Sequence, residues 1–255
     1  SSFTIDTTPP EVTSSELKFS ETNKGIGINS DSSIQFWSNI IQPSFEFESD
    51  KNCYFTITSV TDASISYTSD SGMPAINSLI NANTPMKVVF DALGLNQTYT
   101  DLKLTLTDEA NNINIFDIAQ FEIDNTNPVL SIVNPIPTII NITSPSIIFS
   151  CDEIATFEIT PVLSYTLPVD TNIIIGDNTI IFDLSSDSDQ LYNNYIIKVT
   201  DRAGNFTDLN IPDFTLDRVP PTLEIVGFEG GFTNLINIEN PQFTFKSDKK
   251  GIFEI

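Results

Sequence analysis

Residues 200–221 read TDRAGNFTDLNIPDFTLDRVPP, and the two phrases near the ends of this stretch decide the fold. The first phrase, TDRAGN, is an acidic loop sequence, and the second, FTLD, is followed two residues later by a pair of prolines. Both phrases also occur earlier, as TDEANN at 107–112 and FEIDNTNP at 121–128, and their aspartates are 16 residues apart in each copy. Two phrases in the same order at the same spacing indicate an internal repeat.

The repeat covers the whole chain. A third copy of the second phrase, FTIDTTPP, occupies residues 3–10. A further phrase, in which two phenylalanines eight residues apart flank an acidic turn, occurs at 47–55, 149–157 and 245–253. The period from Asp124 to Asp217 is 93 residues and that from Asp6 to Asp124 is 118, so the first unit is longer by 118 − 93 = 25 residues.

Units of about 100 residues with short alternating strands and frequent turns are typical of immunoglobulin-like β-sandwiches. The composition agrees, because 40% of the residues are hydrophobic and 19 are phenylalanine, which favours strands. We therefore predict an all-β protein of tandem immunoglobulin-like β-sandwich domains. The predicted boundaries are a terminal strand of a preceding repeat at 1–6, an enlarged first unit at 7–124, a second unit at 125–217, and the first strands of an incomplete third unit at 218–255.

Strand positions follow from alternating apolar residues between turn signals. In the second unit we predict strands A, B, C, E, F and G at 129–133, 146–150, 156–159, 178–183, 195–200 and 213–217. In the third unit we predict strands A, B and C at 222–226, 242–245 and 252–255. The proline pair after strand G cannot continue a hydrogen-bonded ladder, so we expect it to end the unit and stiffen the junction.

The charge balance limits the classes of partner. The chain has 34 acidic and 11 basic residues, a net charge of 11 − 34 = −23, and no histidine. Such a field repels nucleic acid and anionic membranes and attracts cations, which makes nucleic acid a poor partner. Without histidine the usual general base is missing and a zinc site is not expected, so we predict that the protein is not an enzyme.

Two further features concern the cellular setting. Cys53 and Cys151 fall at non-equivalent positions of different units, so no intrachain disulfide is expected. No apolar run approaches the ~20 residues that a membrane-spanning helix needs. This segment is therefore predicted not to span a membrane.

The topology of the sandwich predicts where the repeated acidic residues meet. The B–C and F–G loops lie at the pole where the chain enters a unit, and the last aspartate of the preceding unit lies at that same pole. Calcium takes six to eight oxygen ligands and would neutralise such a cluster, whereas the alternative is that each aspartate accepts backbone hydrogen bonds in its own turn. The residues predicted to bind metal at the three junctions are Asp6, Asp50 and Asp108; Asp124, Asp152, Glu153 and Asp201; and Asp217 and Asp248. Lys51 follows Asp50 where the second unit has the acidic Glu153 after Asp152, so the first junction is the weaker case for calcium.

The repeated phrases resemble the immunoglobulin-like tandem repeats of giant bacterial and archaeal cell-surface proteins of the adhesin, biofilm or surface-layer type. The junction of that family reads F-x-x-D-x-x-P-P and its loop reads T-D-x-A-G-N, which residues 200–205 match and 107–112 match except at Asn111. The resemblance implies an extracellular cell-surface setting, junctional calcium, and partners that are further repeats of the same polypeptide or identical chains in an array. We therefore expect a non-enzymatic stalk or surface-array segment.

Two other functions stay open from the sequence. The enlarged first unit would serve as a glycan- or protein-binding module if Trp37, Tyr99 and the insertion at 73–83 formed a binding face, with core filling as the alternative. The units would otherwise be accessory domains of a secreted hydrolase. Glycosylation acceptor triplets begin at Asn96, Asn141 and Asn205.

Overall fold

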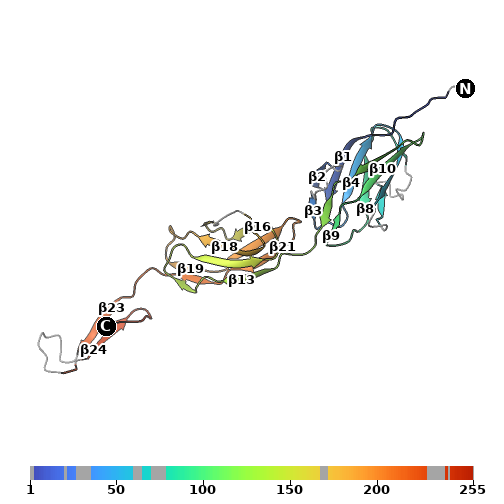
Figure 1. Cartoon of the computed structure of the whole chain (residues 1–255). Helices are drawn as coiled ribbons and strands as arrows, with labels where there is room; N and C mark the ends of the chain where they lie inside the picture. Colours follow the sequence, from blue (N-terminus) through green and yellow to red (C-terminus); the bar gives the residue numbers. More distant parts are fainter. Residues whose placement is uncertain are drawn as a thin grey trace.

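The computed structural model describes residues 3–19, 22–26, 36–59, 65–69, 79–166, 172–228, 239–240 and 242–254. The regular structure in these ranges is β-strand, arranged as two sandwiches followed by a two-stranded ribbon (Figure 1). The described ranges contain no helix long and apolar enough to cross a membrane.

The second unit shows the strand order most simply. One antiparallel sheet has the order β13 (Leu130–Asn134), β15 (Ser146–Cys151), β18 (Gly176–Phe182) and β17 (Tyr165–Thr166). The other has the order β16 (Ala155–Thr160), β20 (Ile196–Asp201) and β21 (Phe206–Asn210). This sheet is continued by β19 (Gln190–Tyr192), β22 (Phe214–Leu216) and β14 (Ile139–Ile140), which pairs with β22 in parallel. In strand letters, the first sheet (β13, β15, β18, β17) is A-B-E-D and the second (β16, β20, β21) is C-F-G. Two sheets of this order facing each other are the immunoglobulin arrangement.

The first unit repeats this plan and adds one strand. Its first sheet contains β1 (Val12–Phe19), β4 (Ser44–Ser49), β8 (Met86–Phe90) and β6 (Tyr67–Ser69). Its second contains β5 (Cys53–Thr58), β10 (Lys103–Asp108) and β11 (Ile113–Asp117), continued by β9 (Gln97–Tyr99), β12 (Phe121–Ile123) and β3 (Phe36–Ser38). The addition is β2 (Thr22–Ile26), which pairs with β1 and widens the first sheet at its edge. The short strand β7 (Leu79–Ile80) pairs with β5 at Cys53, where the second unit has an isolated bridge between Ala155 and Ile173.

Each sandwich has its own hydrophobic core. Along β10 and β20 every second residue is buried, as expected for strands with one face against a facing sheet. In the first core Phe47 packs edge-on against Phe55, with 5.3 Å between the ring centroids. Cys53 and Cys151 are buried, unpaired thiols, and burial raises the pKa of both.

Two predicted strands differ from the structure. Residues 252–254 form no strand, because the strand that pairs with β16 in the second unit, β20, has no counterpart in the third unit within these 255 residues. The third unit is described as β23 (Leu223–Phe228) paired with β24 (Phe243–Ser247). Strand G begins earlier than predicted, at β21, and is interrupted before β22 at Pro212, which lacks a backbone N–H to donate.

Candidate metal centre

The loop between β20 and β21 is organised by one carboxylate. Asp201 is buried, and its Oδ1 accepts the backbone N–H groups of Gly204 at 2.6 Å and Asn205 at 2.8 Å. Its Oδ2 accepts the side-chain amide of Asn205 at 2.8 Å. Gly204 has φ +98°, a conformation that favours glycine, and the equivalent residue of the first unit, Asn111, also has a positive φ, of 66°. In the first unit Asp108 organises the equivalent loop.

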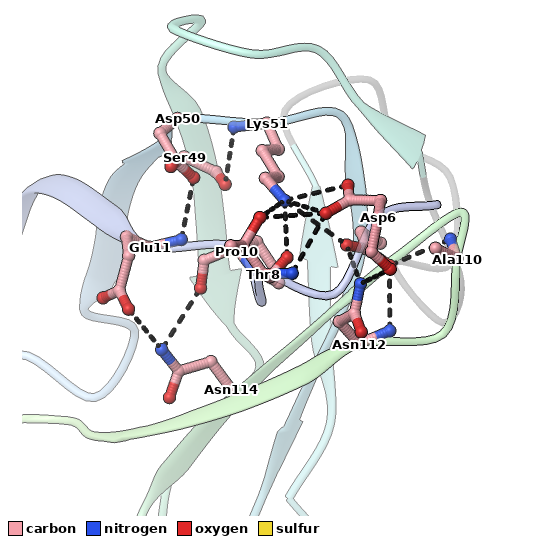
Figure 2. A network of polar contacts seen from close by, with 11 residues as sticks. Asp6, Thr8, Pro10, Glu11, Ser49, Asp50, Lys51, Ala110, Asn112 and Asn114 are labelled. Atoms are coloured by element: carbon pink, nitrogen blue, oxygen red, sulfur yellow. Dashed lines mark hydrogen bonds and ion pairs between the residues drawn. The ribbon is translucent and has the colours of Figure 1, made fainter. Parts of the chain in front are cut away.

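This loop also holds the chain that enters the unit. The side-chain amide of Asn205 donates to the carbonyl of Asp124 at 2.9 Å, and the Thr207 hydroxyl donates to the carbonyl of Pro128 at 2.6 Å. Asp124 is the last aspartate of the first unit, so Asn205 joins the two units directly. The first junction has the same pair of contacts, made by Asn112 to Asp6 at 3.1 Å and by Asn114 to Pro10 at 3.2 Å (Figure 2).

The aspartates of the acidic turns have a different role from the one the sequence predicted. Asp152 Oδ1 accepts the backbone N–H of Val129 at 2.7 Å, just before strand β13. Asp50 accepts the N–H of Glu11, and Asp248 accepts the N–H of Thr222, each at 2.8 Å. These three carboxylates therefore anchor the first strand of their own unit and accept backbone N–H groups from outside their own turn. None of them belongs to the carboxylate cluster described next.

Three of the predicted residues meet at the middle junction, where the first unit joins the second. Asp124, Glu153 and Asp201 each present a carboxylate oxygen, and these oxygens all lie within 4.8 Å of one another. Desolvation, assisted by the negative charges of Asp201, Asp124 and Asp152, raises the pKa of Glu153 to about 7. Two of the three carboxylates, Glu153 and Asp201, come from the second unit, and the third comes from the first.

This cluster has the donor set and the spacing for a hard divalent cation. Ca²⁺ binds carboxylate oxygens at about 2.3–2.6 Å, so two of its ligands lie within roughly 5 Å of each other. Oxygens within 4.8 Å of one another fit that requirement. Among the described residues this is the one group of three acidic, histidine or cysteine side chains close enough to share an ion.

The first junction has a lysine among its carboxylates. The ammonium of Lys51 lies 2.9 Å and 3.1 Å from the two carboxylate oxygens of Asp6 and 3.7 Å from Asp108 Oδ2 (Figure 2). It also donates to the carbonyl of Thr8 at 2.5 Å and to the Thr8 hydroxyl at 2.7 Å. The hydrogen bond from Lys51 lowers the pKa of Asp6 to about 2, assisted by Thr8. A metal ion does not fit here, because the ammonium already contacts the oxygens that would bind it.

The third junction is built in the same way. The ammonium of Lys249 lies 2.5 Å and 2.7 Å from the two carboxylate oxygens of Asp217 and donates to the carbonyl of Val219 at 2.7 Å. The sequence predicted carboxylates at both outer junctions, and the structure places a lysine ammonium against them. The signal was present in the sequence, since the aligned acidic turns end in Lys51, Glu153 and Lys249.

Other residues singled out in the sequence are placed as follows. Tyr99 is buried and stacks on Phe121 with 5.0 Å between ring centroids, so it fills the core. Trp37 lies at the middle junction, with the guanidinium carbon of Arg202 5.0 Å from its ring centroid. Of the insertion at 73–83, residues 73–78 lie outside the described residues.

Comparison with known proteins yields structural neighbours only. No protein-family model and no curated protein matches the chain. The adhesin InvE of Yersinia pseudotuberculosis has 11% identity and a TM-score of 0.27 over 71% of this chain, which spans 56% of the length of the adhesin chain. The titin domains z1z2, from a complex with telethonin, have 11% identity and a TM-score of 0.30 over 82% of this chain and 98% of theirs. Neither likeness carries an argument, and the fold rests on the strand order and cores described above.

Proposed function

We propose that this chain is a non-enzymatic structural segment of a large extracellular cell-surface protein, in which immunoglobulin-like units follow one another and calcium fixes the middle junction. The carboxylate cluster of Asp124, Glu153 and Asp201 carries the proposal. The resemblance of the junction and loop phrases to repeats of giant cell-surface proteins supports the extracellular setting. Further repeats of the same polypeptide, or identical chains in an array, are the proposed partners.

Electrostatics favours a cation at this junction. Two carboxylates about 5 Å apart repel each other by roughly 3 kcal/mol at an effective dielectric constant of about 20, and Asp124, Glu153 and Asp201 form three such pairs when all are ionised. Without a cation, desolvation and this repulsion raise the pKa of Glu153 to about 7, so the group partly binds a proton instead. Calcium bound here would supply the opposing charge. Because Asp124 belongs to the first unit and the other two residues to the second, holding all three together also holds the two units together.

The remaining contacts support a structural role for the repeated acidic residues. Asp201 organises its loop, and Asp152 anchors the first strand of its unit. Asp124 accepts the N–H of Thr126 at 3.0 Å and thereby forms the turn that starts the linker. Each repeated carboxylate thus has a task in positioning the chain at a junction, which favours architecture over catalysis.

A second candidate function, binding of a glycan or protein, is favoured by one surface of the first unit. A depression there is lined by Tyr54, Phe55, Thr56, Thr105 and Thr107. It carries no charged side chain in a chain of net charge −23, and Ile113 and Ile115 on neighbouring β11 are exposed. Binding to a glycan array that Tyr54→Ala abolishes would support this function, and an array without signal would count against it.

Calcium titration of the 255-residue chain tests the proposed junction. We expect calcium to raise the melting temperature and a chelator to reverse the rise, because calcium binds the folded junction and not the unfolded chain. Glu153→Gln removes one of three carboxylates and should weaken binding at least about tenfold. Glu158→Gln, at an exposed glutamate of β16, is the matched control and should bind as the parent chain does. A parent chain that binds no calcium in calorimetry and melts identically in chelator would disprove the calcium junction.

A further inference from the structure

We infer that the ammonium groups of Lys51 and Lys249 are built-in cations, which do at the outer junctions what a bound metal ion does at the middle one. The chain would then contain one junction that depends on a metal ion, between two junctions that do not. The contrast between the joints rests on the proposed calcium junction, whereas the role of the lysines can be tested separately.

The first support is the alignment of the three acidic turns. They read SDK at 49–51, CDE at 151–153 and SDK at 247–249. The aspartate in the middle of each turn has the same partner in all three, the backbone N–H that starts the first strand of its unit. The residue that follows is lysine, glutamate and lysine. The last residue of each turn therefore takes the same position at its junction. Its charge is positive in the first and third turns and negative in the second.

The second support is the set of oxygens around each ammonium. At the first junction Lys51 contacts both carboxylate oxygens of Asp6 and the carbonyl of Thr8, two residues further along the chain. At the third junction Lys249 contacts both carboxylate oxygens of Asp217 and a carbonyl that is also two residues further along. The same kind of oxygen-lined position holds a cation in two of the three copies.

The middle junction has the equivalents of these oxygens. Asp124 corresponds to Asp6, and its carboxylate forms the same turn, accepting the N–H two residues further along. Asp201 corresponds to Asp108, the residue 3.7 Å from the Lys51 ammonium. The equivalent of the Thr8 carbonyl is that of Thr126, which we assign as a fourth oxygen ligand beside the three carboxylates. An oxygen-lined position without its lysine needs a cation from outside.

The first and middle junctions carry the same net charge once the middle one holds a divalent ion. Two carboxylates and the Lys51 ammonium leave the first junction with a charge of −1. Three carboxylates with one divalent cation leave the middle junction with −1 as well. Replacing lysine by glutamate changes the local charge by two units, which is the charge of a calcium ion. A divalent ion therefore compensates this substitution completely, whereas a monovalent ion does not.

Exchanging the two side chains tests the inference. In the full chain we expect one bound calcium ion for the parent, two for Lys51→Glu, and none for Glu153→Lys, measured by isothermal titration calorimetry in a calcium-free buffer. Lys246→Glu makes the same charge change at an exposed lysine of β24 and should leave the count at one. The circular dichroism spectrum of each variant shows whether it keeps its β-structure.

The outcomes separate this inference from the calcium proposal. If the parent binds one ion and Lys51→Glu still binds one, the lysine does not replace a metal, although the middle junction stands. If the parent binds none and Lys51→Glu binds one, the lysine inference stands and the middle calcium junction fails. More than one ion on the parent, or none on either protein, overturns the inference. If Lys51→Glu does not fold, Glu153→Lys decides: retained calcium binding there contradicts the inference.

Discussion

At the scale of single residues, the pair Asp6 and Lys51 determines how the first junction responds to acid. The hydrogen bond from Lys51, with those from Thr8, lowers the pKa of Asp6 from 3.8 to about 2. A carboxyl group with a depressed folded-state pKa contributes stability above its unfolded pKa and loses that contribution as the pH falls through its folded pKa. The contribution of Asp6 is therefore complete above pH 3.8 and lost toward pH 2.

Lys51→Met removes this contribution without adding charge. We expect it to lower the free energy of unfolding of the first unit by a constant amount above about pH 4, and the difference from the parent to shrink between pH 3.8 and about 2. Urea denaturation followed by Trp37 fluorescence measures this, because Trp37 is the single tryptophan and lies in the first unit. Lys250→Met, at an exposed lysine of the third unit, should have no such effect. A difference that persists unchanged at pH 2 would be inconsistent with the pairing.

At the scale of elements, much of the fold could be predicted from the repeated phrases, since β15, β16, β18 and β20 lie within one or two residues of their predicted positions. The first half of strand G could not. Its residues FTDLN do not alternate between apolar and polar, because Thr207 and Asp208 are both polar, and they belong to an edge strand, so only pairing with β20 identifies them as a strand. Residues 252–254 have an apolar pattern similar to that of strand C of the second unit, but among the described residues no strand is there to pair with them. The pattern therefore gives no strand at this position.

The candidate site was predictable in its location and less so in its composition. The sandwich topology places the B–C turn and the F–G loop at one pole, and Glu153, Asp201 and Asp124 do meet there. Which oxygen of a turn faces the linker depends on local hydrogen bonds, and these direct Asp152 to the amide of Val129. The reach of Lys51 across the linker to Asp6 likewise depends on the three-dimensional path of the chain.

The loop between β20 and β21 should be sensitive at Asn205, whose side chain is 6% exposed. Its amide donates to Asp201 Oδ2 and to the carbonyl of Asp124, so Asn205→Ala leaves one buried and one partly buried acceptor without this donor. We expect the free energy of unfolding of the second unit to fall by about 2 kcal/mol. Asn210→Ala, on the exposed face of β21, is the control and should cost under about 0.5 kcal/mol. Urea denaturation followed by circular dichroism compares them, and equal losses would contradict the role of Asn205.

At the scale of the whole molecule, three kinds of contact join the first and second units. Asn205 bonds to the backbone of Asp124, the carboxylate cluster spans the junction, and Arg202 lies over the ring of Trp37. The aromatic contact is worth about 0.5–1 kcal/mol at an exposed site, so it is too weak to hold the units against repulsion among three carboxylates. We therefore expect the state of the cluster to decide how firmly this junction is held, and Trp37 to report that state.

Trp37 makes the junction observable in the unmodified chain. If calcium holds Asp124 against Glu153 and Asp201, it also holds the loop that carries Arg202 against the indole, because Arg202 follows Asp201 directly. We expect the emission of Trp37 to change on calcium addition, to return with chelator, and to follow the same binding curve as calorimetry. Arg202→Ala should remove most of the fluorescence change while calcium binding persists, whereas Lys198→Ala, on the β20 strand of the same unit, should leave both intact. Calcium binding with an unaltered Trp37 signal in the parent chain would mean that the ion does not set the contact between the two units.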